Sequence, residues 1–297
     1  MTNPITISPS GNTKFVSGRG PNRTVGRNRP VGVQPFFEDT FSNGQTNPAN
    51  GFIYSNDRGG LTNSTIVAVG DANAQVEDGF THSLRTKYNA QALGLQSGNG
   101  QINFSLGRSC NPLWFEWRVH IPSNYVHRNN YSPPSTPMSD NNKFWIFWAT
   151  SYSNGYQQVG LETVTDGTTG TGTSNGKSYT RPLMRYSTNG SYTDIPGGGT
   201  AFIGTGEEMI PGTWNTVRGY FKKETTQGAG DGEWKYWING TILHSFTGLN
   251  MGATDSAKFA DNVNYGYLLG AANSGFTDET LFHTQWIKFY DTDPGWL

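Results

Sequence analysis

Residues 211–246 decide the fold of this chain, and they read PGTWNTVRGYFKKETTQGAGDGEWKYWINGTILHSF. Two runs in this stretch, Trp214–Lys222 and Glu233–Ile238, alternate with a period of two, and a Gly-rich turn joins them. An Asn-Gly dipeptide at 239–240 follows at once, and a third short run, Thr241–Phe246, comes next. Because Asn-Gly favours the tight turn of a β-hairpin, the stretch predicts a three-stranded β-meander.

Similar runs fill most of the remaining sequence, and Asn-Gly or Asp-Gly pairs separate many of them. The further candidate strands are Thr65–Val69, His82–Tyr88, Gln101–Leu106, Leu113–Ile121, Lys143–Ala149, Gly155–Val164, Leu183–Tyr186, Thr200–Gly204, Tyr265–Leu269 and Phe282–Tyr290. No convincing amphipathic helix lies among them. About a dozen short strands without a helix predict an all-β sandwich of two antiparallel sheets.

The composition agrees with this class of fold. The chain has 297 residues, 39 of them glycine, with 13% aromatic and only 14% charged residues, which suits many short strands and turns and argues against disorder. Its formal net charge of −1 gives no strong attraction to nucleic acid or to an anionic membrane surface. Cys110 is the single cysteine, so an intrachain disulfide and a thiolate metal cluster are both excluded, and we expect a small buried side chain there.

The first 35 residues differ from the rest. They contain five basic residues and no acidic one, and they lack the apolar run of a secretory signal. We expect residues 1–35 to form an extended basic arm and residues 36–297 to form one domain. The arm is either a disordered tail or a segment that docks on a neighbouring subunit, and five spread charges make nucleic-acid binding the weaker expectation. No segment approaches the length and apolarity of a membrane span.

Several motifs resemble the concanavalin A-like lectin and glucanase jelly rolls. The phrase G-x-W, a strand, then W-x-N-G is similar to the late strands of that superfamily, and Phe37–Phe41 resembles its opening strand. Gly79–Arg85 is similar to a G-x-x-S-L-R strand, and Trp114–Pro122 followed by Lys143–Trp148 resembles the central strands of the polysaccharide-lyase branch. The resemblance covers roughly residues 36 to 293. It implies a concanavalin A-like jelly-roll β-sandwich and a protein that binds or cleaves polysaccharide.

The strand Trp114–Ile121 carries the sharpest polar pattern. Period-two alternation places Phe115, Trp117 and Val119 on one face and Glu116, Arg118 and His120 on the other. The family resemblance implies that such a polar face binds sugar. A uronate lyase needs a cation for the carboxylate, a base for the C5 proton and an acid for the leaving oxygen. For a lyase we therefore predict the set Arg118, His120 and Tyr186 as catalytic residues.

The same resemblance suggests further glycan contacts, some polar and some aromatic. These candidates are Arg85, Glu116, Trp145, Gln158, Arg185 and Trp237. An exposed aromatic ring would stack on the apolar face of a pyranose, and Trp145, Tyr186 and Trp237 are the candidates, but a place in the core is the favoured explanation for each of them. Glu116 and Arg118 likewise have the alternative of pairing across a solvated face of the sheet.

The sequence departs from the catalytic motifs of the branch. Alginate lyases of this fold carry R-x-E-x-R, Q-I-H or Q-V-H, and Y-x-K-x-G-x-Y-x-Q. Here Arg118-Val119-His120 is only an echo of the second motif, and the last one is missing. The E-x-D-x-x-E motif of the glucanases does not occur, so a two-carboxylate mechanism has no carrier.

Sandwiches of this type often bind calcium where the first and last strands meet. Glu38, Asp39 and Asp291 occupy the matching positions, and Asp293 is an additional candidate. We expect no required cofactor and treat a structural calcium ion as the one implied group.

These observations favour a structural or glycan-binding protein of a phage particle, as a capsid decoration, head-fibre or tail component. Its expected partners are other virion subunits, reached through the arm, and a polysaccharide or cell-surface glycan, and we expect a homo-oligomer located in the virion. The alternative is a polysaccharide lyase that cleaves a uronic-acid polymer by β-elimination. A free lectin-like module is a third hypothesis.

Overall fold

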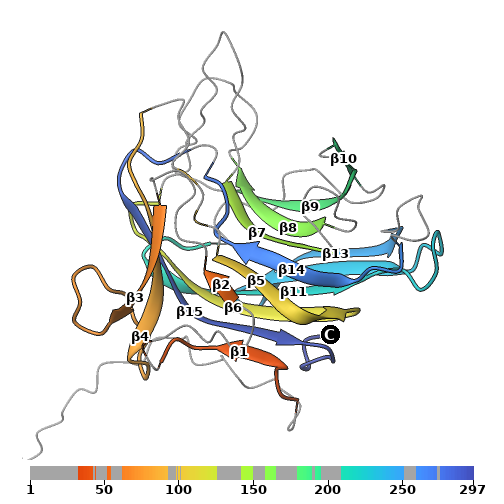
Figure 1. Ribbon diagram of the computed structural model, residues 1–297, viewed down its shortest axis with the longest axis horizontal. Helices are drawn as coiled ribbons and strands as arrows, with labels where there is room; N and C mark the ends of the chain where they lie inside the picture. The colour runs from red at the N-terminus through yellow and green to blue at the C-terminus, as the bar shows by residue number, and fades with distance from the viewer. Residues whose placement is uncertain are drawn as a thin grey trace, which may run out of the picture.

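The computed structural model describes residues 33–42, 44, 52–54, 62–92, 98, 100, 102–125, 142–149, 158–164, 179–188, 191–194, 209–250, 259–272 and 275–297. Residues 1–32 of the predicted arm and the predicted strand Thr200–Gly204 lie outside this part. The described elements are strands, which confirms the all-β prediction (Figure 1). None of the described segments forms a helix long and apolar enough to cross a membrane.

The strands form two antiparallel sheets. Sheet A contains β1 (Phe37–Asp39), β3 (Thr62–Ala68), β4 (His82–Tyr88), β6 (Leu113–Ile121), β11 (Thr213–Lys222), β12 (Gly232–Ile238), β13 (Thr241–Leu249) and β15 (Thr280–Tyr290). Sheet B contains β2 (Phe52–Tyr54), β5 (Ile102–Cys110), β7 (Asn142–Trp148), β8 (Gln158–Val164), β9 (Tyr179–Thr188), β10 (Ser191–Asp194) and β14 (Val263–Leu268).

The strand order shows how the sheets are built. Sheet A runs β13-β12-β11-β6-β15-β4-β3, and β1 pairs with the second half of β15. Sheet B runs β10-β9-β8-β7-β14-β5-β2. The predicted meander is therefore one end of sheet A, and β6 lies at its centre between β11 and β15.

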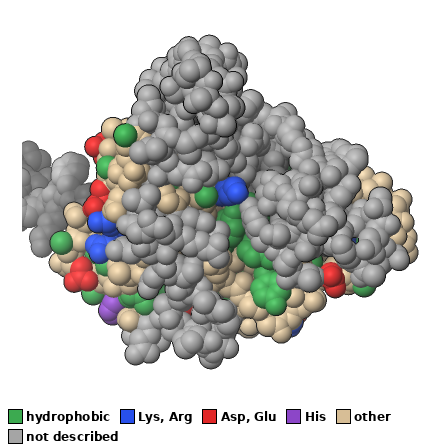
Figure 2. Space-filling model, turned by 45° about the horizontal axis from the view of Figure 1, so that its top comes forward, with side chains coloured by type: hydrophobic (Ala, Val, Ile, Leu, Met, Phe, Trp, Pro, Cys, Tyr) green, Lys and Arg blue, Asp and Glu red, His purple; other side chains and the backbone are tan. Residues whose placement is uncertain are grey.

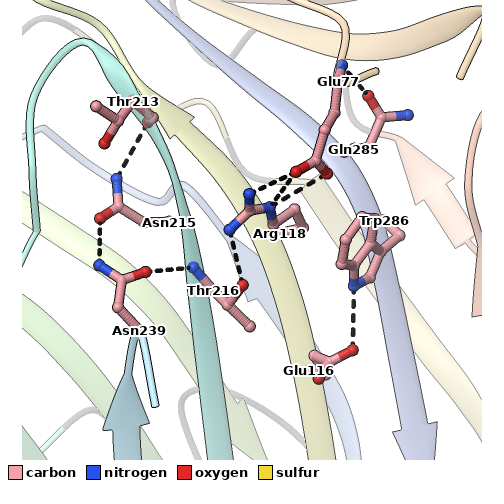
Figure 3. A network of polar contacts seen from close by, with 9 residues as sticks. All are labelled: Glu77, Glu116, Arg118, Thr213, Asn215, Thr216, Asn239, Gln285 and Trp286. Carbon is pink, nitrogen blue, oxygen red and sulfur yellow. Dashed lines mark hydrogen bonds and ion pairs between the residues drawn. The ribbon is translucent and has the colours of Figure 1, made fainter. Parts of the chain in front are cut away.

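The Asn-Gly turn of the meander has the predicted conformation. Asn239 and Gly240 both have a positive φ, +52° and +84°, as the hairpin turn of this dipeptide requires. The Asn239 side chain also accepts a hydrogen bond from the Thr216 amide and donates one to Asn215 (Figure 3). The turn is thus fixed to the neighbouring strand β11.

Aromatic side chains fill the space between the two sheets. Phe115 and Trp117 of β6 pack here against Trp145, Phe147 and Phe144 of β7. Alternation alone predicts that Phe144 lies on the opposite face from Trp145 and Phe147. A β-bulge between Lys143 and Trp145 brings Phe144 into the core as well.

A glycine makes room for one of these rings. A Cβ atom on Gly219 of β11 would lie 2.0 Å from the Phe115 ring, so no larger residue fits this position without displacing the ring. The faces that point away from the core are called below the outer face of sheet A and the outer face of sheet B.

Candidate functional site

The polar residues of β6 lie on the outer face of sheet A, as the alternation predicts. Phe115, Trp117 and Val119 face the core, which places Glu116 and Arg118 on the opposite side. This polar face is not open to solvent, since Glu116 is 5% exposed, Arg118 7% and His120 8%.

Arg118 is held by a carboxylate from a loop. Its Nε lies 3.0 Å from Oε1 and 3.2 Å from Oε2 of Glu77, and Nη2 also donates to Glu77 (Figure 3). Nη1 donates to the Thr216 hydroxyl at 2.8 Å. The charge of the guanidinium is therefore already neutralised within the protein, and Arg118 is poorly placed to neutralise a substrate carboxylate.

Glu116 is similarly occupied. It accepts hydrogen bonds from Arg218 Nε at 2.7 Å and from the indole of Trp286 at 3.3 Å. The Arg218 guanidinium in turn lies 4.8 Å from the ring centre of Trp296, in the tail that follows β15. Glu116 and Arg118 therefore do not pair with each other across a solvated face: each is buried, and their partners are Arg218 and Glu77.

Trp237 lies in an aromatic cluster on the same outer face. Trp114, Tyr220, Trp237 and Tyr290 are all buried there, and Trp296 packs over them. Because Trp237 is only 8% exposed, its ring is largely unavailable to a sugar.

Arg85 and His120 belong to a third group on this face. Arg85 donates to the Ala72 carbonyl at 3.0 Å, and burial lowers the pKa of His120. His120 packs edge-on to Trp214 and to His283, with ring centres 5.4 and 6.1 Å away. A neutral imidazole is the right form for a base, but its burial under protein atoms leaves little access for substrate.

The prediction that Trp145 stacks on sugar is wrong. Its ring is fully buried between Phe115, Phe147 and Trp234. Trp145 shares the inner face of β7 with Phe147, and its aromatic neighbours there make it a core residue.

Gln158, Arg185 and Tyr186 belong to sheet B, so the predicted site residues divide between the two sheets. Gln158 and Arg185 are Cα partners in the β8–β9 ladder. Val159 pairs with the core residue Phe147, so by alternation position 158 belongs to the outer face. Position 185 shares this outer face, and position 186 belongs to the inner one.

The outer face of sheet B carries an aromatic strip that the sequence patterns did not identify. Ile146, Trp148 and Tyr267 form a cluster separate from the core, and Trp148 packs edge-on to Tyr267 with ring centres 5.6 Å apart. Tyr265 pairs in the ladder with Trp148 on one side and Ser105 on the other. The missed signal was the Tyr-Gly-Tyr alternation at 265–267, which places both phenols on one face.

Tyr265 is the most accessible part of this strip. It is 36% exposed, and among the aromatic side chains whose burial the structure describes it is the one that counts as exposed. Trp148 beside it is half-buried. Figure 2 shows hydrophobic side chains beside a Lys or Arg side chain in a hollow of the face drawn.

Lys143 lies at the other end of the aromatic strip. A Cβ atom on Gly270 would lie 2.3 Å from the Tyr267 ring and 3.0 Å from Lys143 Cβ, so the tyrosine and the lysine flank the same glycine. Lys143 is half-buried. The strip therefore runs from an exposed tyrosine, past a buried one, to a cation.

The predicted calcium ligands do not converge. Glu38 pairs with Lys288, Asp291 pairs with Arg108, and Asp39 accepts a hydrogen bond from the Phe41 amide. In the part of the chain that the structure describes, no group of three His, Cys, Asp or Glu side chains is placed to hold a metal ion. A structural calcium ion at these positions stays a prediction from the sequence.

No family model matches the chain, and no curated protein matches it. Among solved structures, the chain is similar to the alginate lyase vAL-1 from a Chlorella virus, with 14% identity, a TM-score of 0.50, and 79% of this chain and 94% of that chain covered. An endo-β-1,4-glucuronan lyase from the fungus Trichoderma reesei shares 11% identity over 87% of this chain and 96% of its own, with a TM-score of 0.49. A GH16 protein from Bacteroides ovatus shares 11% identity over 85% and 99%, with a TM-score of 0.46.

At these identities the likeness shows the fold alone. The two antiparallel sheets, together with the fold likeness to vAL-1, confirm the predicted architecture. The chain has a jelly-roll β-sandwich fold, similar to that of the vAL-1 structure.

Proposed function

We propose that this protein is a polysaccharide lyase that binds a uronic-acid polymer along the outer face of sheet B. The observation that carries the proposal is the aromatic strip Trp148, Tyr265 and Tyr267, which lies outside the core and includes an exposed ring. The fold likeness to a protein named as an alginate lyase supports the choice of substrate class.

The strip suits a polysaccharide because aromatic rings stack on the apolar faces of pyranose rings. Trp148 and Tyr265 are Cα partners on adjacent strands, so they present neighbouring positions on one surface. Positions 158 and 185 continue the same row across β8 and β9. The predicted glycan contacts Gln158 and Arg185 therefore fall beside the strip, and we assign them to the same site.

The reaction requires three tasks. A base removes the C5 proton, the electron pair forms the C4–C5 double bond as the C4–O bond breaks, and the leaving oxygen takes a proton. We assign proton transfer to the phenol of Tyr265, because it is accessible. Arg185 is the candidate cation for the carboxylate in the same row, and Lys143 is the candidate for a second carboxylate further along the polymer.

Arg118 and His120 are a weaker choice for these tasks. Glu77 neutralises Arg118, and both side chains are buried on the other sheet. Tyr186 belongs to the inner face of sheet B by alternation. Catalysis by this set remains a prediction from the sequence.

The proposal is tested by the turnover of alginate, glucuronan, pectate and glycosaminoglycans. The ultraviolet absorbance of the unsaturated ends that the reaction creates measures this turnover. We expect activity on one polymer and a loss of roughly 10²–10⁴-fold in Tyr265→Phe, which keeps the ring and removes the hydroxyl. Ile242→Ala is the matched control, since Ile242 is 49% exposed on β13 of sheet A. Full activity in Tyr265→Phe would refute the assignment of the phenol.

A glycan-binding protein without catalysis is the second candidate, favoured by the same exposed ring. Affinity electrophoresis in gels that contain each polymer separates the two. Binding that is lost in Tyr265→Ala, without turnover by the unchanged protein, would make this a binding module. Neither binding nor turnover on any polymer would refute both functions.

The placement on a phage particle stays a prediction. It depends on the basic arm, of which residues 1–32 lie outside the described part, and on docking to other virion subunits. Co-sedimentation of the protein with assembled particles, compared with a variant lacking residues 1–32, is the direct test.

A further inference from the structure

A loop covers the polar half of the outer face of sheet A. Residues 69–81 connect β3 to β4 and lie back over the sheet, and this segment is called the 69–81 loop. On β4, the Ser83 hydroxyl donates to the Gln75 carbonyl at 2.7 Å and Arg85 Nη1 donates to the Ala72 carbonyl at 3.0 Å. These two contacts fix the first half of the loop.

The second half is fixed to β15 and β6. The Glu77 amide donates to Gln285 Oε1 at 3.0 Å, and the Glu77 carboxylate holds Arg118 (Figure 3). Phe80 packs on Trp286 with ring centres 5.6 Å apart. The loop thus spans three neighbouring strands by polar contacts and a single ring pair.

Two histidines lie in one row under this cover. His283 of β15 is the Cα partner of His120 on β6 and of Arg85 on β4. His283 is 1% exposed, and both of its ring nitrogens are buried without a hydrogen-bond partner of good geometry. His120 Nδ1 and Arg85 Nε are buried and unpartnered in the same way. Such a row of unsatisfied groups is costly, and it has no anion to balance a proton.

The charges around His283 oppose its protonation. Burial, followed by the neighbouring His120 and Arg85, lowers the pKa of His283 to about 3, and backbone groups of Asn73 and Leu281 offset this only in part. Burial also lowers the pKa of His120.

The other charged groups near the row already have partners. On β4, Lys87 pairs with Glu279, and on β6 Arg118 pairs with Glu77 of the loop. Asp71 of the loop accepts a hydrogen bond from the Ala68 amide.

We infer that the 69–81 loop is an acid-sensitive cover, closed at neutral pH over His120 and His283 and opened when these histidines take up protons. The closed loop excludes the water that a charged imidazole needs, whereas an open loop admits it. Opening in acid leaves Arg85, Arg118 and the two imidazolium groups on one surface. This surface is then cationic. The inference does not depend on the proposed lyase function.

The size of the effect follows from linkage. In the open state His283 has an ordinary histidine pKa near 6.5, and in the closed state it has a much lower one. Below pH 6.5, His283 binds a proton in the open state but not in the closed state. The ratio of open to closed loop therefore rises about 25-fold between pH 7 and pH 5 for this one histidine.

Hydrogen exchange followed by mass spectrometry of the full chain, on peptides that cover residues 69–81, measures this ratio. After correction for the intrinsic pH dependence of exchange, we expect loop protection to fall at least tenfold between pH 7 and pH 5. Exchange in β6 and β11 should change much less. Equal protection of the loop at both pH values would overturn the inference.

Variants identify the group that titrates. His283→Gln should remove most of the pH dependence of loop protection, because it removes the imidazole that takes up a proton when the loop opens. His244→Gln is the matched control: His244 is a second shielded histidine, on β13, and its substitution should leave the loop response unchanged. If His283→Gln does not fold, loop protection of the unchanged protein decides, and equal protection at pH 7 and pH 5 would then reject the inference.

Discussion

At the residue scale, the contact between Glu77 and Arg118 controls the outer face of sheet A. The two side chains are 21% and 8% exposed, so each charge is largely removed from water and depends on the other. Removal of one partner leaves a shielded charge without compensation, which is much more costly than the loss of a surface ion pair.

Glu77→Gln should therefore lower the free energy of unfolding by about 2–3 kcal/mol. Glu279→Gln is the control, because the ion pair of Glu279 with Lys87 is 47% and 32% exposed and should be worth under about 1 kcal/mol. Urea denaturation of both variants at pH 7 measures the difference. Equal losses of unfolding free energy in the two variants would show that the shielded ion pair of Glu77 contributes no more than an exposed one.

Asn239 contributes to stability through both its backbone and its side chain. Its backbone adopts a positive φ of +52°, and its side chain joins the Thr216 amide to the Asn215 side chain. Asn239→Ala loses both hydrogen bonds and adopts the left-handed conformation less readily. We expect a loss of about 2 kcal/mol in the free energy of unfolding, and Asn239→Gly, which keeps only the backbone freedom, should recover part of it. Identical stability of the two variants would assign the whole effect to the side-chain hydrogen bonds.

At the element scale, the tail after β15 acts as a cover for the aromatic cluster. The Gly295 and Trp296 amides both donate to Asp293 Oδ1, which turns the tail back, and Trp296 then packs against Trp114 and Trp237. The tail is short, so most of its contact with the sheet is made by a single indole ring.

Trp296→Ala should consequently lower the free energy of unfolding by about 2–3 kcal/mol, somewhat less than a fully buried tryptophan. Leu297→Ala is the control from the neighbouring position, since Leu297 is 63% exposed and should change stability by less than about 0.5 kcal/mol. Thermal unfolding of the two variants gives the comparison. The binding of fluorescent hydrophobic dyes to Trp296→Ala should also rise, because the cluster becomes exposed.

At the scale of the whole molecule, the two outer faces differ in how they are covered. Segments of the chain itself, the 69–81 loop and the tail, close the outer face of sheet A. The outer face of sheet B carries Tyr265, which is exposed although it adds little to the core. An exposed aromatic ring outside the core, such as Tyr265, is a stronger sign of ligand binding than polar residues that are already paired within the protein, such as Glu116 and Arg118.

This difference explains what could be predicted from the sequence. Period-two alternation placed Phe115 and Trp117 in the core correctly, because alternation depends only on neighbouring residues. It placed Arg118 and His120 on a polar face correctly as well. Their accessibility depended on Glu77, 41 residues away from Arg118 in the chain, and no local pattern contains that information.

The same reasoning applies to the core tryptophan and to the aromatic strip. Trp145 lies in the core with Phe147, as alternation groups them, but alternation does not tell which face of β7 is the inner one, and the bulge that also brings Phe144 into the core leaves no local signal. Tyr265 and Trp148 became neighbours only through the order of strands β14 and β7, which are distant in the sequence. Local sequence patterns were therefore enough to predict the fold, whereas prediction of the candidate site required the order of the strands in each sheet.

The stability of the whole molecule should decrease in mild acid. Burial lowers the pKa of His244 to about 4 and that of His283 to about 3, whereas the unfolded chain holds both near 6.5. Both histidines are neutral in both states at pH 7. As the pH falls below 6.5, the unfolded state binds protons that the folded state does not, so stability is lost progressively down to about pH 4 for His244 and about pH 3 for His283.

Between pH 7 and pH 5 the loss is at most about 2 kcal/mol for each of these histidines, and smaller for His244, which is only half-buried. Urea unfolding at these two pH values should show a lower midpoint at pH 5, and this range stays above the titration of ordinary carboxylates. The double variant His244→Gln/His283→Gln should flatten the difference, whatever its absolute stability. If the double variant keeps the full pH dependence, the burial of these two imidazoles is not its cause, and the other titrating groups of the fold must be responsible.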